Sequence, residues 1–141
     1  MLDRGILAAK LGELEDRVAR VREHAPASPT ALRTDRDAQD LVAFNPMLAV
    51  QTCSDVAAHV IAAEGWIVAR TLREGFERLH QQGVLSKETG DALAGAVGLR
   101  DVVAHGYAGV DVARLHHAAT AGLAHLDAFG AEVAAWLRAR P

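Results

Sequence analysis

The chain is organised around Leu99-Arg100-Asp101-Val102-Val103-Ala104-His105-Gly106-Tyr107, where an amphipathic helical pattern ends and a turn follows. Arg100 lies three residues after Val97 and seven after Leu93, which places it on their apolar helical stripe. A guanidinium on a buried face requires an anion, because moving an unpaired charge out of water is strongly unfavourable. Asp101 points about a third of a turn away on a helix, so the pattern favours an external anion as the partner of Arg100.

The same stretch carries an imidazole and a phenol. His105 follows Arg100 by five residues, and the ordinary pKa of histidine, about 6.5, suits proton transfer near neutral pH. Gly106 ends the helical pattern, and Tyr107, the only tyrosine in the chain, follows it in the turn. A helix end whose cation and imidazole complement the helix dipole is the structural alternative. The residues by themselves leave both interpretations open.

The spacing of arginine, histidine and tyrosine in this stretch, followed by Ala108-Gly109-Val110-Asp111, resembles the signature of the HepT-like toxins of the HEPN superfamily. Similar but less specific segments occur at residues 36–38, 57–65, 71–79 and 83–85. The resemblance implies that Arg100 and His105 belong to a ribonuclease site. This sequence differs from the family pattern at Asp101, where members of the family often carry asparagine.

The resemblance also implies a biological setting. The chain would be the toxin of a type VII toxin–antitoxin system, and a cognate nucleotidyltransferase antitoxin would attach AMP to Tyr107. Such an adduct would fill the cleft and place a phosphodiester charge beside Arg100, so that incoming RNA is repelled.

Length and composition set limits around this motif. A chain of 141 residues is expected to form a single domain, residues 1–141, with a core of its own. Its one cysteine, Cys53, excludes an internal disulfide and a cysteine-based zinc cluster, and it is expected to be buried. We find no membrane-spanning run and no signal peptide, so the cytoplasm is expected. The net charge of −3 requires any RNA contact to be a local patch.

The hydrophobic periodicity predicts an all-α, antiparallel bundle of about five helices, HEPN-like and dimeric. The first helix is expected over residues 3–23, and the prolines within 25–29 should break it. A second helix should run from residue 34 to Gly65, with Pro46 causing a kink or a division into two helices. His59 on this helix is expected to be a surface or packed residue.

The second half of the chain predicts three further helices. Thr71 and Glu74 have the spacing of a capping box, for a short helix that ends at Gly83. Ser86 should cap the fourth helix, and its glycines suggest close packing or a site that needs room. Asp111 should cap one long last helix that ends beyond Trp136. The histidines of this last helix lack metal-site spacing and are expected on the surface: His116, His117 and His125.

The sequence contains no glycine-rich phosphate loop, nucleophile elbow or paired carboxylates, so we predict chemistry without a metal or cofactor. Cleavage of RNA by its own 2′-hydroxyl fits, because the substrate supplies both nucleophile and electrophile. His105 is the predicted general base or acid, Arg100 holds the scissile phosphate, and Asp101 orients the site. The motif offers one histidine per chain, which is insufficient for a reaction that needs both a base and an acid, so a homodimer is expected to supply a second His105.

A rival interpretation is a non-catalytic accessory subunit of a small nucleotidyltransferase. In that case Arg100 and His105 would serve only nucleotide binding or structure. Expression of the chain alone in a bacterium separates the two, since a ribonuclease should impair growth and an accessory subunit should not.

Overall fold

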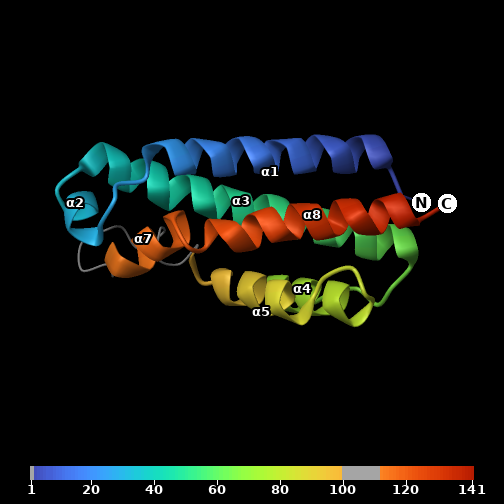
Figure 1. Ribbon diagram of the computed structural model, residues 1–141. Coiled ribbons are helices and arrows are strands. Elements are labelled where there is room, and N and C mark those ends of the chain that lie inside the picture. Colours follow the sequence, from blue (N-terminus) through green and yellow to red (C-terminus); the bar gives the residue numbers. More distant parts are fainter. Residues whose placement is uncertain (1, 100–111) are drawn as a thin grey trace.

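The computed structural model describes residues 2–99 and 112–141. Within these ranges the regular secondary structure is entirely helical, as the periodicity predicted. The helices are α1 (Arg4–His24), α2 (Pro29–Arg33), α3 (Arg36–Glu64), α4 (Leu72–Gln81), α5 (Lys87–Ala96), α7 (Val112–Ala119) and α8 (Leu123–Ala139) (Figure 1).

Three long helices form the body of the bundle. α1 packs along α3 and α8, and it runs antiparallel to both of them (Figure 1). α4 and α5 pair with each other and pack against α3 and α8, while α2 and α7 lie together at the end of the bundle where α3 begins. The two chain termini lie at the opposite end of the bundle (Figure 1). α5 runs from that side toward the end that carries α2 and α7.

The core is aliphatic, with two phenylalanines at its centre. Phe76 of α4 and Phe129 of α8 are fully buried and meet edge to face, with ring centroids 6.1 Å apart and planes at 88°. This arrangement places the positive edge of one ring against the negative face of the other. Cys53 is fully buried among the aliphatic side chains of α3, as expected from its apolar surroundings. Among the described residues, no helix has the length and apolarity needed to cross a lipid bilayer.

Short polar side chains begin the helices at the predicted places. Asp3, Asp35 and Ser86 each accept a hydrogen bond from the backbone amide three residues further on, at 3.0 to 3.2 Å. These bonds satisfy amides that the first helical turn leaves without a partner. Gly65 ends α3 in the left-handed conformation, at φ 70°, where a side chain would be strained.

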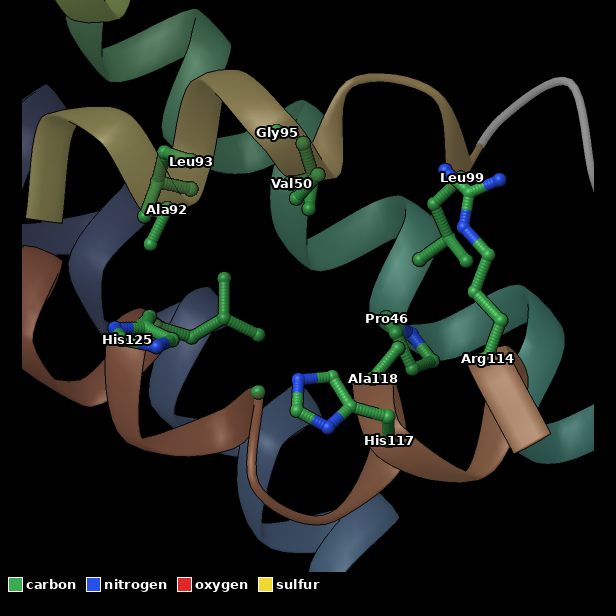
Figure 2. Close-up of a pocket in the computed structure, with 13 residues that line it drawn as sticks. Pro46, Val50, Ala92, Leu93, Gly95, Leu99, Arg114, His117, Ala118 and His125 are labelled. Carbon is green, nitrogen blue, oxygen red and sulfur yellow. The ribbon is translucent and has the colours of Figure 1, made fainter. Parts of the chain in front are cut away.

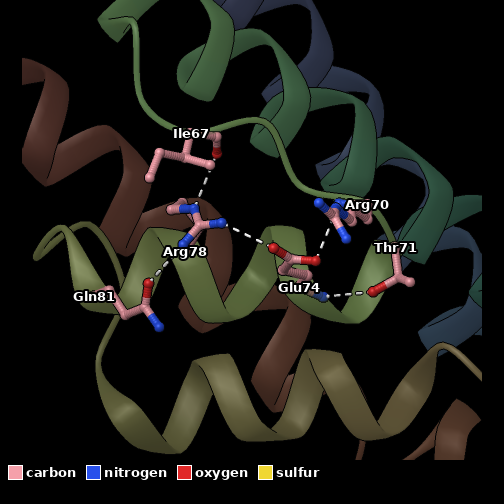
Figure 3. A network of polar contacts seen from close by, with 6 residues as sticks. All are labelled: Ile67, Arg70, Thr71, Glu74, Arg78 and Gln81. Atoms are coloured by element: carbon pink, nitrogen blue, oxygen red, sulfur yellow. Dashed lines mark hydrogen bonds and ion pairs between the residues drawn. The ribbon is translucent and has the colours of Figure 1, made fainter.

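The cap of α4 differs from the predicted capping box (Figure 3). Thr71 accepts from the amide of Glu74 as expected, but the Glu74 carboxylate accepts from the amide of Arg70 rather than from that of Thr71. The other oxygen of Glu74 binds the Arg78 guanidinium at 2.9 Å, and Arg78 also donates to the carbonyl of Ile67. Arg78 therefore fastens the loop that precedes α4 to the helix itself.

Pro46 lies inside one continuous helix, which resolves the two alternatives left open by the sequence. The neighbouring Asn45 is buried, and its Nδ2 donates to the carbonyl of Leu41, 3.0 Å away. Its Oδ1 accepts from Arg17 of α1 at 3.3 Å. Packing against α1 thus supports the helix at the residue where proline removes a backbone donor.

The last helix of the prediction is wrong, because the chain divides it into α7 and α8 at residues 120–122. The amide of Gly122 donates to the carbonyl of His117 at 2.8 Å, and the hydroxyl of Thr120 donates to that of His116. A Cβ on Gly122 would lie 3.1 Å from the backbone of Ala118, so glycine permits this tight turn. The predicted cap, Asp111, lies outside the described residues.

Two further boundaries differ from the prediction. Ser28 and Pro29 start the short helix α2 within the segment expected to be a connector, because serine caps it and proline is tolerated in the first turn. α5 ends at Ala96, and a turn at Val97 and Gly98 follows. The unbroken helix that placed Arg100 on the stripe of Leu93 is therefore interrupted, and that argument for its burial no longer holds.

Candidate functional site

The predicted site residues fall between two described positions. Arg100, Asp101, His105 and Tyr107 lie outside the described residues, which end at Leu99 and resume at Val112. Leu99 is buried, with 5% of its surface exposed. The site can therefore be built from the residues that lie on either side of this stretch.

A pocket of about 290 Å³ lies at the first of these positions, Leu99 (Figure 2). Its walls come from the end of α5, the middle of α3 and the junction of α7 with α8. The apolar part of the lining is formed by Pro46, Val50, Leu93, Leu99 and Leu126. This size approaches the lower end of the range for small-molecule sites, roughly 300 Å³.

The polar part of the lining comes from α7 and α8 and is basic. Arg114 and His117 lie on α7, one turn apart, and His125 lies on the first turn of α8. Figure 2 shows Arg114 beside Leu99, with the two imidazoles along the α7–α8 side. Among the described residues, none that lines this pocket is acidic, although the chain as a whole has a net charge of −3. The pocket therefore concentrates donors suited to an anion.

Two glycines shape the α5 side of the pocket. A Cβ added to Gly95 would meet no atom within 4 Å, so the helix leaves open space there. A Cβ added to Gly98 would lie 3.0 Å from Nη2 of Arg114. Gly95 therefore gives the room that the sequence suggested, whereas Gly98 and Gly90 serve close packing, since the Cβ of Gly90 would lie 3.3 Å from that of His80.

The prediction placed the histidines of the last helix on the surface, and this is only partly right. His117 is exposed but faces the pocket, and His125 is half-buried within its lining. His116 is half-buried, and its Nε2 is hydrogen-bonded to the carbonyl of Pro26, 2.8 Å away. His59 does not line the pocket, and its Nε2 accepts a hydrogen bond from the amide of Asp3.

The sequence analysis missed Arg114, His117 and His125 as a group. Their spacing contained a signal, because residues three apart lie on one face of a helix, and Arg114 and His117 follow the motif directly. His125 could not be added from spacing, since the turn at Gly122 changes the direction of the helix. Among residues 2–99 and 112–141, no group of three histidine, cysteine or carboxylate side chains could hold a metal ion.

Cys53 is excluded as a nucleophile by its surroundings. Burial raises the pKa of its thiol well above the ordinary value of 9.0, because the thiolate would lose its hydration. Its side chain is 0% exposed and does not line the pocket beside Leu99. Its role is that of a small apolar residue in the core.

Comparison with solved structures shows the fold. The toxin–antitoxin pair MntA-HpeT contains a chain with a TM-score of 0.84 and 21% identity, over 93% of this chain and 98% of that one. A tri-AMPylated HEPN toxin of Shewanella oneidensis, in complex with an MNT antitoxin, gives 0.84 and 22%, over 96% and 99%. YutE of Bacillus subtilis, a cytosolic protein of unknown function, gives 0.82 and 16%, over 97% and 92%.

Comparison of sequences shows the family. No curated protein matches this chain at a significant level. The family described as ribonuclease HepT-like matches residues 14–133, from the first helix to α8, and this match includes the whole of the motif. The resemblance drawn from the motif is thus confirmed, and the chain belongs to the HepT-like family of the HEPN superfamily.

Proposed function

We propose that this chain is a ribonuclease toxin that cleaves RNA without a metal ion. The observation that carries the proposal is the match to the ribonuclease HepT-like family over residues 14–133, which includes the arginine, histidine and tyrosine of the motif. The basic pocket beside Leu99 supports it, because none of its lining residues that the structure describes is acidic and an RNA phosphate needs such surroundings in a chain of negative net charge.

The reaction we propose is transesterification within the RNA. The 2′-oxygen attacks the neighbouring phosphorus, the bond from phosphorus to the 5′-oxygen breaks, and a 2′,3′-cyclic phosphate and a 5′-hydroxyl result. A base removes the proton of the 2′-hydroxyl, and an acid returns a proton to the leaving oxygen. His105 serves in this proton transfer, Arg100 stabilises charge on the phosphate, and Asp101 orients Arg100.

A homodimer completes this site. One chain offers a single His105, and the reaction requires two proton-transfer groups. Two-fold symmetry would bring a second Arg100 and His105 to the first if the motif lies near the axis. The proposed assembly is therefore a dimer with the motif segments of both chains at its centre.

We assign control of the ribonuclease activity to a partner protein. The two similar complexes described above join a toxin to an antitoxin, and in one of them the toxin is tri-AMPylated. By analogy, a cognate nucleotidyltransferase would transfer AMP from ATP to the hydroxyl of Tyr107, with release of pyrophosphate. We expect both proteins to act in the cytoplasm, where the RNA substrate is.

The decisive experiment uses purified protein and a mixed-sequence RNA in the presence of a chelator. Cleavage should persist and leave 2′,3′-cyclic phosphate ends, and Arg100→Ala and His105→Ala should each abolish it. His24 is an exposed histidine at the end of α1, so His24→Ala is the matched control and should cleave RNA normally. Loss of cleavage on chelation, or full activity of His105→Ala, would contradict the mechanism.

A growth experiment separates the ribonuclease from a non-catalytic accessory subunit. Expression of the wild-type chain alone should stop bacterial growth, and expression of His105→Ala should not. Normal growth with the wild-type chain, together with no cleavage in vitro, would favour the accessory subunit.

A further inference from the structure

We propose that the pocket between α5, α3 and the α7–α8 junction binds one nucleotide of an RNA strand. This inference rests on the proposed function for the identity of the strand, but its argument comes from the pocket. The apolar lining would receive the flat faces of a base, and the basic rim would receive its phosphate.

The chemistry of the lining selects this ligand. A nucleotide combines a weakly hydrated base with an anionic phosphate, and the pocket combines aliphatic walls with an arginine and two imidazoles. Among the described residues, neither His117 nor His125 makes a side-chain hydrogen bond within the protein, so both imidazoles can donate to a ligand. A purely apolar ligand would leave these donors unused, and a lining whose described residues include no acidic side chain disfavours a cation.

Size and position narrow the inference to one nucleotide. A volume of about 290 Å³ accommodates one base with its sugar and phosphate better than a longer stretch of RNA. Leu99, in the lining, directly precedes Arg100 in the chain, and Arg114 follows Asp111 by three residues. Residues of the lining therefore flank the motif segment in the chain on both sides.

The test measures binding to an RNA that cannot be cleaved. A fluorescent oligoribonucleotide with 2′-O-methyl groups lacks the attacking hydroxyl, so its affinity is independent of catalysis. The double variant His117→Ala/His125→Ala should weaken binding by about tenfold, because two donors to phosphate are lost. Gly95→Leu should weaken it by a similar factor, since the new side chain would enter the open space beside the pocket.

Matched controls exclude general effects of these substitutions. Gly12 is a helical glycine of α1 whose Cβ would also meet no atom within 4 Å, and it lies on a different groove of the bundle. Gly12→Leu and His24→Ala should bind the RNA within twofold of the wild type. Circular dichroism and light scattering check that each variant keeps its fold and assembly. If Gly95→Leu fails either check, the histidine variant decides.

The outcomes distinguish this inference from the proposed function. If the wild-type protein cleaves ordinary RNA but both pocket variants bind the methylated RNA normally, the pocket inference is wrong and the ribonuclease stands. If the pocket variants lose binding while the wild-type protein cleaves nothing, the pocket stands and the ribonuclease proposal fails. Failure of the wild-type protein to bind the methylated RNA would overturn the pocket inference.

The source of the nucleotide is tested by competition. Adenosine 5′-monophosphate at millimolar concentration should displace the labelled RNA from the wild-type protein, and inorganic phosphate at equal concentration should displace much less. Equal competition by both would show that only charge is recognised, and it would overturn the base-binding part of the inference.

Discussion

The guanidinium of Arg114 lies directly over Gly98, so that a Cβ at Gly98 would come within 3.0 Å of Nη2. This contact joins the turn after α5, at Val97 and Gly98, to α7, the helix that follows the motif in the chain. Any larger residue at position 98 must therefore push the guanidinium aside. Because the atom that must move is the far end of a flexible side chain, the movement needs no change of the backbone.

Gly98→Ala should accordingly alter the pocket without unfolding the protein. We expect the free energy of unfolding to change by less than about 1 kcal/mol, since no core side chain is affected. Affinity for the 2′-O-methyl RNA should fall by roughly threefold, about 0.65 kcal/mol, as the cation moves from its place. Fluorescence anisotropy measures the affinity, and Gly12→Ala, with open space around its Cβ, is the control. An unchanged affinity would show that the position of Arg114 is unimportant for RNA.

Tyr107→Phe should prevent silencing by the cognate nucleotidyltransferase. Incubation of the wild-type protein with that enzyme, ATP and magnesium should add one or more AMP units to Tyr107 and stop RNA cleavage. The phenylalanine variant should gain no mass and keep at least part of its toxicity, because the phenol has no assigned part in proton transfer. Intact-mass measurement and peptide mapping locate the adduct. An adduct on another residue of the variant would defeat the assignment.

The proposed composite site requires a stable homodimer. Light scattering on a sizing column at micromolar concentration should give twice the mass of one chain. Mixing the wild-type protein with an excess of His105→Ala should lower the activity per wild-type chain, because the mixed dimer holds only one His105. Mixing the wild-type protein with an equal excess of His24→Ala is the control and should leave the activity per wild-type chain unchanged. A monomer at all concentrations would remove the argument for a site shared between two chains.

Arg78 and Arg22 form ion pairs of similar length in different surroundings, which permits a matched test. Arg78 binds Glu74 at 2.9 Å with 14% of its side chain exposed, and Arg22 binds Asp127 at 2.8 Å with 56% exposed. Arg78→Ala should destabilise the protein by about 1–3 kcal/mol, because the carbonyl of Ile67 and the side chain of Gln81 also lose their donor. Arg22→Ala should cost about 0.5 kcal/mol or less. Urea unfolding gives both values, and equal effects would contradict the importance of burial.

The burial of Cys53 predicts that the protein loses stability at alkaline pH. Burial raises its thiol pKa in the folded state, so the folded protein holds a proton that the unfolded chain releases above about pH 9. The free energy of unfolding is therefore unaffected by this thiol below about pH 9. Above that pH it falls by up to about 1.4 kcal/mol per pH unit. Comparison of wild type with Cys53→Ala by urea unfolding at pH 8 and pH 10 isolates it. The two proteins should differ in their pH dependence, and parallel behaviour would show that the thiol is accessible.

The sequence by itself determined the helical class, most helix starts and the family. Aspartate and serine caps are local, since each satisfies an amide three residues away, and Asp3, Asp35 and Ser86 could therefore be placed without knowledge of the fold. The motif from Arg100 to Tyr107 identified the family for a similar reason, because its information lies in the spacing of chemical groups along the chain.

Only the tertiary structure decided how segments distant in the sequence meet. Pro46 stays within one helix, and next to it the buried Asn45 accepts a hydrogen bond from Arg17 of α1, a contact that the local sequence does not contain. The division of the last helix depends on a turn at Gly122 that folds back on the preceding turn, and it turns His125 toward the pocket that also contains His117. Periodicity reports which face of one helix is apolar, whereas a pocket depends on the relative placement of several helices, and that placement comes from side-chain packing across the whole core.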